Sequence, residues 1–151
     1  MDRVAIGLGS NLADRSAHLQ HAIAQLRRLL TNLKVSGFYE TEPVGVGSQP
    51  PYLNAAVVAD TSRTPRALLA ELLAIEQERG RHRPFPGAPR TLDLDLILFG
   101  SVVLNEPHLT VPHPRFRERR FVLEPLAEIA PELIDPVTGR SIRELLASLT
   151  P

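Results

Sequence analysis

The chain has 151 residues, 43% of them hydrophobic, and its 17 basic residues are matched by 17 acidic ones, so the formal net charge is zero. A chain of this size can bury one core, which predicts a single domain over residues 1–151, and balanced charge excludes a global field that would attract nucleic acid or an anionic membrane. Cysteine is absent, which excludes disulfides and thiolate metal sites. No apolar run is long enough to span a bilayer and no signal peptide opens the chain, so we expect a cytoplasmic enzyme or binding domain.

The first elements predicted are a short strand and a long helix. Residues 4–8 are apolar and lead into the glycine-containing segment 7–11, which indicates a buried strand ending in a tight turn. The two glycines there would let a phosphate approach, but the third glycine of a dinucleotide fingerprint is missing, so packing and ligand binding both stay open. Residues 16–30 have apolar residues at helical spacing, and His18 and His21 on this helix are interpreted as surface residues rather than ligands.

Two further strands flank a long loop. Residues 33–39 and 52–59 are the predicted strands, and residues 40–51 between them contain too much glycine and proline for regular structure. A long loop in a small domain is usually functional or mobile. Asn54 is polar among apolar neighbours, and it either satisfies local backbone groups or recognises the polar edge of a ligand.

A second helix follows. Thr64 is a suitable N-cap with Pro65 in the first helical position, and the helix is expected to end near Gly80. Glu76 falls on its last turn. Residues 83–89 then form a stiff, irregular loop rich in proline.

The most informative stretch is residues 89–99, Pro-Arg-Thr-Leu-Asp-Leu-Asp-Leu-Ile-Leu-Phe. In an extended strand its side chains alternate between faces. One face then carries an unbroken apolar row, Leu92, Leu94, Leu96 and Leu98. The other carries Asp93 and Asp95, about 7 Å apart, with Ile97 and Phe99 continuing their row.

Two carboxylates in so apolar a strand would repel each other and resist desolvation unless a cation lies between them. Mg²⁺ commonly takes one or two protein carboxylates and completes its shell with water and phosphate oxygens. Arg90 stands just upstream and suits bidentate phosphate binding. The alternative is a half-exposed edge strand with two solvated aspartates, and the leucine row together with Arg90 favours the metal site.

Arginine provides every basic residue except Lys34, and half of the arginines fall in two clusters on either side of the aspartate strand. The clusters are Arg79, Arg81, Arg83 and Arg90, and Arg115, Arg117, Arg119 and Arg120. With the two aspartates they predict a site for a polyphosphate with magnesium, in which positioning and charge neutralisation matter more than covalent catalysis. His113 either donates to a phosphate oxygen, acts as an acid, or is a buried structural histidine between prolines.

The rest of the chain is largely helical. A short strand is expected at residues 102–104 and an extended segment at 109–114, where prolines disfavour helix. Residues 121–129 form a helical patch whose start Pro125 is expected to limit. Ser141 and Glu144 form a capping box that opens a last helix, residues 142–149.

The predicted order of elements is strand, helix, strand, strand, helix, strand. This order predicts an α+β fold with a ferredoxin-like βαββαβ core, an antiparallel sheet covered by helices on one face, and a helical C-terminal extension. A nucleic-acid-binding domain on such a sheet is disfavoured, because aromatic residues are few and the candidate strand carries aspartates. A metal-dependent phosphohydrolase that uses the same two aspartates stays open.

Six motifs in order carry a resemblance to a known family: residues 9–12 (Gly-Ser-Asn-Leu), 38–43 (Phe-Tyr-Glu-Thr-Glu-Pro), 52–56 (Tyr-Leu-Asn-Ala-Ala), 89–95, 109–115 (Leu-Thr-Val-Pro-His-Pro-Arg) and 128–133 (Glu-Ile-Ala-Pro-Glu-Leu). Over nearly its whole length the chain resembles the 6-hydroxymethyl-7,8-dihydropterin pyrophosphokinases of the folate pathway. The arginine-to-aspartate run and the Val-Pro-His motif make the resemblance specific. It departs from some members in having Phe85 as the only aromatic residue in the loop where they carry tryptophan, and Glu42 where they carry a second proline.

The resemblance implies transfer of pyrophosphate from ATP to the hydroxymethyl group of the pterin, with release of AMP. It implies two Mg²⁺ ions that bridge Asp93 and Asp95 to the triphosphate, with Arg81 and Arg90 joining these aspartates as catalytic residues. The residues implied to contact ATP or line its pocket are Glu76, Arg81, Arg83, Arg90, Leu96, Thr110, His113 and Arg119. The partners expected are ATP and the pterin alone, with no nucleic acid and no membrane, and the expected state is a monomer.

The resemblance also implies a pterin site. The ring would lie between Tyr52 and Phe121, with its polar edge recognised by Asn54 and by the backbone from Thr41 through Pro43 to Val44. A flat heterocycle with apolar faces and a polar edge suits those residue types.

Overall fold

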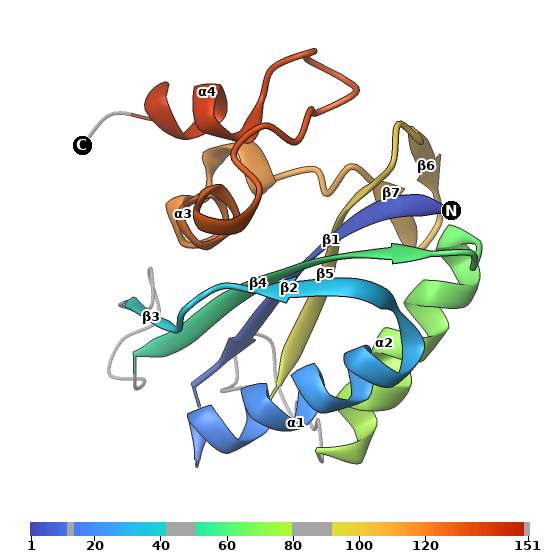
Figure 1. The fold of residues 1–151 in the computed structure, drawn as a ribbon, viewed down its shortest axis with the longest axis vertical. Coiled ribbons are helices and arrows are strands. Elements are labelled where there is room, and N and C mark those ends of the chain that lie inside the picture. The colour runs from blue at the N-terminus through green and yellow to red at the C-terminus, as the bar shows by residue number, and fades with distance from the viewer. Residues whose placement is uncertain (12–13, 42–50, 80–91, 150–151) are drawn as a thin grey trace.

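The computed structural model describes residues 1–11, 14–41, 51–79 and 92–149 (Figure 1). The described strands of the main sheet are β1 (Asp2–Ser10), β2 (Thr31–Val35), β3 (Tyr39–Thr41), β4 (Tyr52–Thr61) and β5 (Asp93–Phe99). They form a five-stranded antiparallel sheet in the order β2-β4-β1-β5, with β3 also pairing with β4. A two-stranded sheet contains β6 (Leu104–Glu106) and β7 (Leu109–Val111). The predicted ferredoxin-like core, βαββαβ in order, is therefore confirmed, with the second strand divided in two.

Helices α1 (Arg15–Leu29) and α2 (Pro65–Glu78) cover one face of the sheet (Figure 1). Each begins at a capping side chain: Asp14 accepts from the backbone N–H of Ala17 and Thr64 from that of Ala67, both at 3.1 Å. Alternate residues of β1, β4 and β5 face these helices, as period-2 patterning requires. The core of this layer contains Val4, Ile6, Leu8, Leu19, Leu26, Ala55, Val57, Leu68, Leu72, Leu92, Leu94 and Leu96.

The C-terminal extension covers the opposite face. It contains a short 3-10 helix η1 (Phe116–Glu118), α3 (Arg120–Ile129) and α4 (Ile142–Ala147). Its second core contains Ala5, Ala56, Val58, Ile97, Leu98, Phe116, Val122, Leu123, Leu126, Ile142 and Leu145. The capping box is confirmed: Ser141 Oγ accepts the Glu144 N–H at 3.1 Å, and Glu144 Oε1 accepts the Ser141 N–H at 2.9 Å.

Several predicted boundaries are wrong. Helix α3 begins ahead of Pro125, which lies inside it: the proline removes one intrahelical hydrogen bond, and burial of Val122, Leu123 and Leu126 in the core offsets that loss. Helix α4 ends at Ala147 rather than 149. The short strand is β6 at 104–106 rather than 102–104, because Gly100 has a positive φ of 54° and the Val102 N–H bonds back to the Phe99 carbonyl in a turn.

The strand predicted over residues 33–39 is two strands, interrupted at residues 36–38. Ser36 explains the break. Its N–H donates to the Ala56 carbonyl at 2.9 Å, but the Ala56 N–H is accepted by the Ser36 hydroxyl at 2.9 Å in place of a backbone carbonyl. The ladder to β4 therefore stops at this serine and resumes in β3.

A β-bulge in β5 makes part of the predicted alternation of side chains between the two faces of this strand wrong. Ile6 pairs with Leu96 and Ala5 with Leu98, so Ile97 is the extra residue. Beyond the bulge the faces exchange: Phe99 joins the core under α1 and α2, and Leu98 joins Ile97 in the core under α3. Leu98 therefore does not continue the leucine row, and Phe99 does not continue the aspartate row.

His18 is buried, with 9% of its surface exposed, and is not the surface residue expected. Its Nδ1 accepts a hydrogen bond from Arg79 Nε at 2.9 Å, and its Nε2 lies buried without a hydrogen-bond partner in the described part of the chain. His21, one turn later, contacts Glu78 at 3.0 Å. The two histidines thus join the start of α1 to the end of α2.

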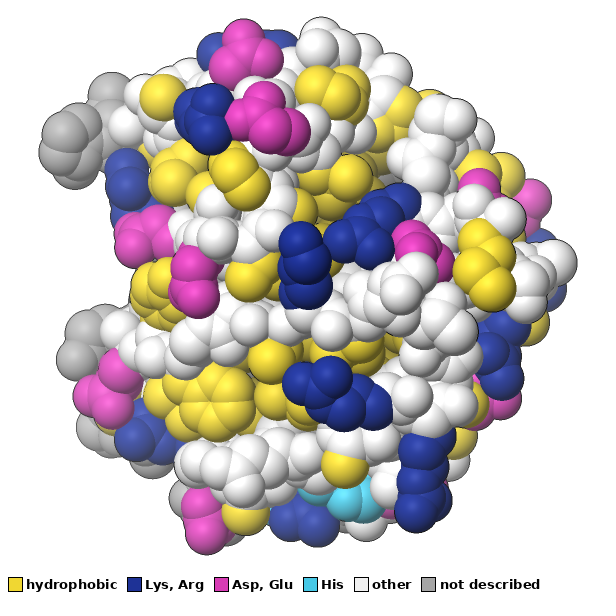
Figure 2. Space-filling view, viewed as in Figure 1, with side chains coloured by type: hydrophobic (Ala, Val, Ile, Leu, Met, Phe, Trp, Pro, Cys, Tyr) yellow, Lys and Arg dark blue, Asp and Glu magenta, His cyan; other side chains and the backbone are white. Residues whose placement is uncertain are grey.

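Charged side chains are mixed over the surface. On the face shown in Figure 2, the Lys and Arg side chains lie in several separate places, with Asp and Glu side chains among them. Among the described residues no helix is both long and apolar enough to cross a membrane.

Candidate active site

The aspartates of β5 lie beside a floor of glycine. Asp93 pairs with Gly9 and Asp95 with Gly7 on the neighbouring strand, and Gly9 in turn pairs with Asn54 on β4. Paired residues project from the same face, here the one covered by α3. Both aspartates are half-buried. The row from Asp93 through Gly9 to Asn54 therefore has polar side chains at both ends and a residue without a side chain in the middle.

Close packing explains the glycine at position 9. A Cβ there would lie 3.1 Å from Asn54 Oδ1 and 3.8 Å from Tyr52 Cδ1, so these two side chains lie over Gly9. A Cβ at Gly7 would meet only Ile97 Cδ1 at 3.5 Å, an ordinary contact. The sequence left packing and ligand approach open for this pair of glycines; at Gly9 the packing explanation is supported by the geometry.

The residues predicted to recognise the pterin edge meet on β3 and β4. Tyr39 pairs with Asn54 and Thr41 with Tyr52. The Asn54 Nδ2 donates to Thr41 Oγ1 at 2.6 Å, and Asn54 is 5% exposed. The partner is a side-chain hydroxyl, which neither of the two roles weighed from the sequence named, and the contact fixes the amide so that its Oδ1 faces Gly9.

His113 lies near the aspartates although it comes from the C-terminal part of the chain. Its N–H donates to the carbonyl of Ile97, the bulge residue, at 2.9 Å, and its Nδ1 accepts the Arg115 N–H at 3.1 Å. Burial lowers the pKa of His113, the positive charge of Arg119 lowers it further, and the carboxylate of Asp93 opposes them. His113 is therefore neutral at pH 7, and its Nε2 carries the proton and is a hydrogen-bond donor.

Arg119 links two groups of predicted site residues. It precedes α3, and its guanidinium lies over the ring of Phe121 with Cζ 5.5 Å from the ring centroid. Phe121 is half-buried against the core under α3. A predicted phosphate ligand and a predicted pterin contact are thus stacked on each other.

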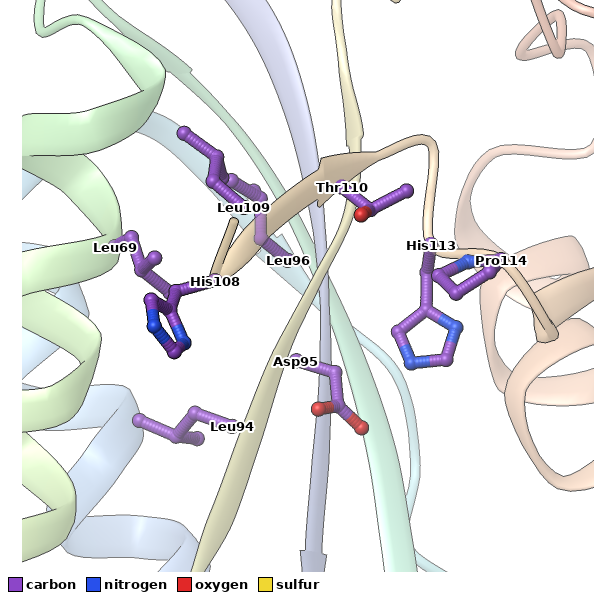
Figure 3. Close-up of a pocket in the computed structure, with 9 residues that line it drawn as sticks. All are labelled: Leu69, Leu94, Asp95, Leu96, His108, Leu109, Thr110, His113 and Pro114. Atoms are coloured by element: carbon purple, nitrogen blue, oxygen red, sulfur yellow. The ribbon is translucent and has the colours of Figure 1, made fainter. Parts of the chain in front are cut away.

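A pocket of about 270 Å³ opens along the outer side of β5, between α2 and β7 (Figure 3). Its lining consists of Leu69, Leu94, Asp95, Leu96, His108, Leu109, Thr110, His113 and Pro114. In Figure 3 the Asp95 carboxylate points toward the side on which His113 lies, and His108 lies with Leu69 and Leu94 on the other side. The pocket brings together Asp95, Leu96, Thr110 and His113, four of the residues to which the resemblance assigns a role, and those roles stay predictions.

Sequence reasoning did not single out Leu69 or His108 as lining residues. Leu69 is one of many apolar residues on an amphipathic helix, and nothing in its spacing separates a pocket residue from a core residue. His108 adopts a positive φ of 66° at the turn between β6 and β7. Histidine is among the residues enriched at positive φ, so His108 was the one sequence signal available for this turn.

Glu76 has a structural partner that the sequence does not reveal. It is 2% exposed, and its Oε2 accepts the backbone N–H of Leu94 at 2.7 Å. That N–H belongs to the last strand in the sheet order, so the carboxylate holds β5 against α2 between the two aspartates. A contact of Glu76 with a nucleotide stays a prediction.

Five predicted site residues lie outside the described residues: Pro43, Val44, Arg81, Arg83 and Arg90. Glu42 and Phe85 also lie outside them. Within the described ranges no group of three His, Asp or Glu side chains is arranged to hold a metal ion.

Comparison with known proteins gives a consistent result. A sequence model of the 7,8-dihydro-6-hydroxymethylpterin-pyrophosphokinase (HPPK) family matches residues 5–131. The 2-amino-4-hydroxy-6-hydroxymethyldihydropteridine pyrophosphokinase of Pseudomonas aeruginosa is 44% identical over 150 residues, covering 98% of this chain and 92% of that protein. The protein of the same name from Bacillus subtilis is 46% identical over 142 residues, covering 92% of this chain and 85% of that protein.

Solved structures show the same fold. An HPPK-DHPS protein crystallised in complex with substrates matches with a TM-score of 0.80 and 15% identity, over 97% of this chain and 43% of that chain. The Plasmodium falciparum HPPK-DHPS with pterin and p-hydrobenzoate matches with a TM-score of 0.76 and 15% identity, over 97% of this chain and 44% of that chain. The present chain thus spans less than half the length of these solved chains.

Proposed function

The chain belongs to the 7,8-dihydro-6-hydroxymethylpterin-pyrophosphokinase family, and from this premise we propose how its residues carry out the family's reaction. It is an ATP-dependent transferase of folate biosynthesis that moves pyrophosphate from ATP to the hydroxymethyl group of 6-hydroxymethyl-7,8-dihydropterin, giving AMP and the pterin diphosphate. Such a transfer requires three things of the protein: neutralisation of the triphosphate, alignment of the alcohol, and exclusion of water.

Asp93 and Asp95 are proposed to hold two Mg²⁺ ions. Their carboxylate oxygens are the hard ligands that Mg²⁺ prefers, and two carboxylates leave most of the coordination shell to phosphate and water. Half-burial beside the glycine floor supports this assignment, because bulky neighbours would block the approach of a phosphate. When bound, the ions neutralise charge that develops on the phosphate oxygens during transfer.

Arg119 and His113 are proposed to bind the phosphates. Arginine offers a fixed charge with a planar fork of donors, and His113 offers a neutral N–H at Nε2. The effect of both Asp93 and Arg119 on the pKa of His113 supports their proximity in one site. Arg81, Arg83 and Arg90 are proposed to join them, with Arg81 and Arg90 in catalytic roles.

The pocket along β5 is proposed to take the nucleoside of ATP. Leu69, Leu94 and Leu96 supply apolar walls for a flat base, and Thr110 and His113 supply polar groups. A concave, mostly apolar pocket with a few polar groups is typical of such sites. Its inclusion of Asp95 supports a triphosphate that leads from the pocket toward the aspartates. Glu76 is proposed to line the nucleotide site from behind β5.

The pterin is proposed to lie on the α3 face of the sheet, between Tyr52 and Phe121. Asn54 and Thr41 are close enough to share a hydrogen bond, and they offer amide and hydroxyl groups to a polar heterocycle edge. Pro43 and Val44 are proposed to complete this edge. The Asp93–Gly9–Asn54 row is the observation that carries the proposal, because Asp93 of β5 and Asn54 of β4 lie on either side of β1, whose residue in this row is a glycine without a side chain.

We also propose that the chain acts as a monomer and a single catalytic domain over residues 1–151, in the cytoplasm where ATP is available. The mixture of basic and acidic side chains on the face in Figure 2 supports small-molecule partners rather than nucleic acid.

The test is an assay of the purified protein with Mg²⁺, ATP and 6-hydroxymethyl-7,8-dihydropterin. AMP and the pterin diphosphate are expected in equal amounts, and no AMP is expected without the pterin. AMP formed at the same rate without the pterin would instead indicate the metal-dependent phosphohydrolase.

A further inference from the structure

We propose that Asp135, in the C-terminal extension, is a positioning residue that acts through Arg117 on the segment from His113 to Phe121. This inference rests on the proposed function, because three proposed substrate contacts, His113, Arg119 and Phe121, lie on that segment. Asp135 itself touches none of them. It lies on the turn between α3 and α4, among residues to which no part of the reaction has been assigned.

Asp135 is a fully buried carboxylate with 0% of its surface exposed. Arg117 binds it with two donors, Nε to Oδ2 at 2.5 Å and Nη2 to Oδ1 at 2.9 Å. The Val137 N–H and the Thr138 hydroxyl also donate to it, at 3.0 and 2.8 Å. Both oxygens are therefore occupied, so the geometry of the pair is determined rather than adaptable.

Contacts within the turn itself, which do not involve Arg117, fix the position of the Asp135 carboxylate. The Asp135 N–H donates to the Arg140 carbonyl at 2.9 Å, and the Gly139 N–H donates to the Asp135 carbonyl at 2.8 Å. A β-bridge between Ile134 and Ser141 closes the turn at its base. Asp135 thus offers a fixed anion to the facing segment.

On the other side, Arg117 lies in η1. Its guanidinium also lies over the ring of Phe116, 4.8 Å from the centroid, and that ring is fully buried. Backbone hydrogen bonds join η1 to its neighbours on both sides: the Phe116 N–H donates to the His113 carbonyl at 3.5 Å, and the Arg119 N–H donates to the Phe116 carbonyl at 3.2 Å. A rotation of η1 would therefore move both His113 and Arg119.

The type of interaction indicates that the Arg117–Asp135 pair orients the segment around η1 rather than adding to the stability of the fold. A buried ion pair adds little stability over apolar side chains of the same volume, whereas a bidentate fork fixes orientation. The extension also contains a pair that serves as a control, Arg143 with Glu132 at 2.6 Å, whose side chains are 66% and 72% exposed. That pair is far less constrained, and we expect it to have no effect on the site.

The experiment compares Asp135→Asn and Arg117→Lys with wild type and with the control Glu132→Gln. Thermal unfolding followed by circular dichroism establishes that each variant is folded at the assay temperature. Steady-state kinetics then give kcat and the KM values for ATP and pterin, and NMR titration of the histidine rings gives the pKa of His113, assigned with His113→Gln.

Asp135→Asn is expected to lower kcat/KM for ATP about tenfold to a hundredfold, the range that a displacement of about 1 Å produces. The pKa of His113 is expected to rise toward its ordinary value, because Arg119 would move away from it. Loss of the Asp135 charge alone would lower the pKa of His113, because a negative charge favours the protonated imidazole. Arg117→Lys, which keeps the charge but not the fork, is expected to fall between wild type and Asp135→Asn, and Glu132→Gln to match wild type.

A folded Asp135→Asn with wild-type kinetics and an unchanged His113 pKa would overturn the proposal and leave the pair a purely structural role. Should Asp135→Asn not fold, Arg117→Lys decides by the same two readouts. Should wild type form no AMP in response to the pterin, the proposed function fails, and the His113 titration still tests the link between Asp135 and Arg119.

Discussion

Buried and half-buried carboxylates in this molecule have different surroundings. Asp135 and Glu76 are almost fully buried, and each accepts hydrogen bonds from named protein donors. Asp93 and Asp95 are half-buried, and each pairs across the sheet with a glycine of β1. The first kind of carboxylate joins elements of the fold, and the second kind is the one proposed above to bind Mg²⁺, which prefers hard oxygen ligands.

Asp95→Asn is therefore expected to give a folded protein with little activity. The amide keeps the size of the side chain but loses the charge, and loss of one stabilising group in such a site typically costs about a hundredfold or more in kcat. Pterin-dependent AMP formation measures the activity, and circular dichroism measures the fold. Glu132→Gln, which removes an exposed carboxylate, is the matched control. Turnover near the wild-type rate in Asp95→Asn would contradict the metal-binding role.

Single residues were predictable from sequence where local pattern determines them. Alternation along one strand was enough to put Leu92, Leu94 and Leu96 in the core opposite the aspartates. It was not enough to predict that Glu76 would accept the Leu94 N–H or that His18 would be buried against Arg79. Those contacts join elements distant in sequence, and no local period encodes them.

At the scale of the element, β1 is the strand on which the two halves of the site depend. It lies between β4, which carries Asn54, and β5, which carries the aspartates. Its two glycines, Gly7 and Gly9, put no side chain between Asn54 and the aspartates. They do not have the same surroundings, however, and this difference gives a test with an internal control.

Gly9→Ala is expected to raise the KM for the pterin several-fold while Gly7→Ala leaves it close to wild type. A Cβ at position 9 would lie 3.1 Å from Asn54 Oδ1, so the amide must shift, whereas a Cβ at position 7 makes an ordinary contact with Ile97 at 3.5 Å. Both variants are expected to fold, since alanine suits a strand better than glycine does. Equal KM values for the two variants would show that Asn54 does not determine pterin affinity.

Element prediction succeeded where the ends carry chemical signals. The Thr64 cap and the capping box at Ser141 each stand at a helix start, because a side-chain acceptor there satisfies N–H groups that the helix leaves open. It failed where one side chain interrupts a ladder, as at Ser36, or where a residue is added to a strand, as at Ile97. Both depend on the partner strand.

At the scale of the whole molecule, the sheet separates two cores that have different tasks. The α1 and α2 side packs alternate residues of the central strands into a continuous apolar layer. The α3 side is apolar under the extension and polar where β5, β1 and β4 carry Asp93, Gly9 and Asn54. The order of elements predicted this topology. The position of the extension over the site was not predictable, because it depends on long-range contacts such as Arg117 with Asp135.

His18 and His113, one on each side of the sheet, are both expected to make the stability of the protein depend on pH. Burial first, and then neighbouring positive charge, lower the pKa values of both His18 and His113 below the ordinary value of 6.5. Between the lowered values and 6.5 the unfolded chain binds more protons than the folded one, so stability rises with pH in that window and falls as pH falls through it. Asp60, Asp135 and Glu144 have lowered pKa values too, but their contribution is lost only in more acidic solution, below about pH 4.

The free energy of unfolding is therefore expected to be lower at pH 5.5 than at pH 7.5, and urea denaturation at the two values measures the difference. His18→Gln is expected to reduce that difference, because the amide oxygen can still accept from Arg79 but does not titrate. His113→Gln is expected to reduce it as well, and the double variant most of all, since the two side chains lie on opposite sides of the sheet and distant effects add. A difference that is the same in all four proteins would show that neither imidazole resists protonation, and that the acid response between these two pH values arises from other groups.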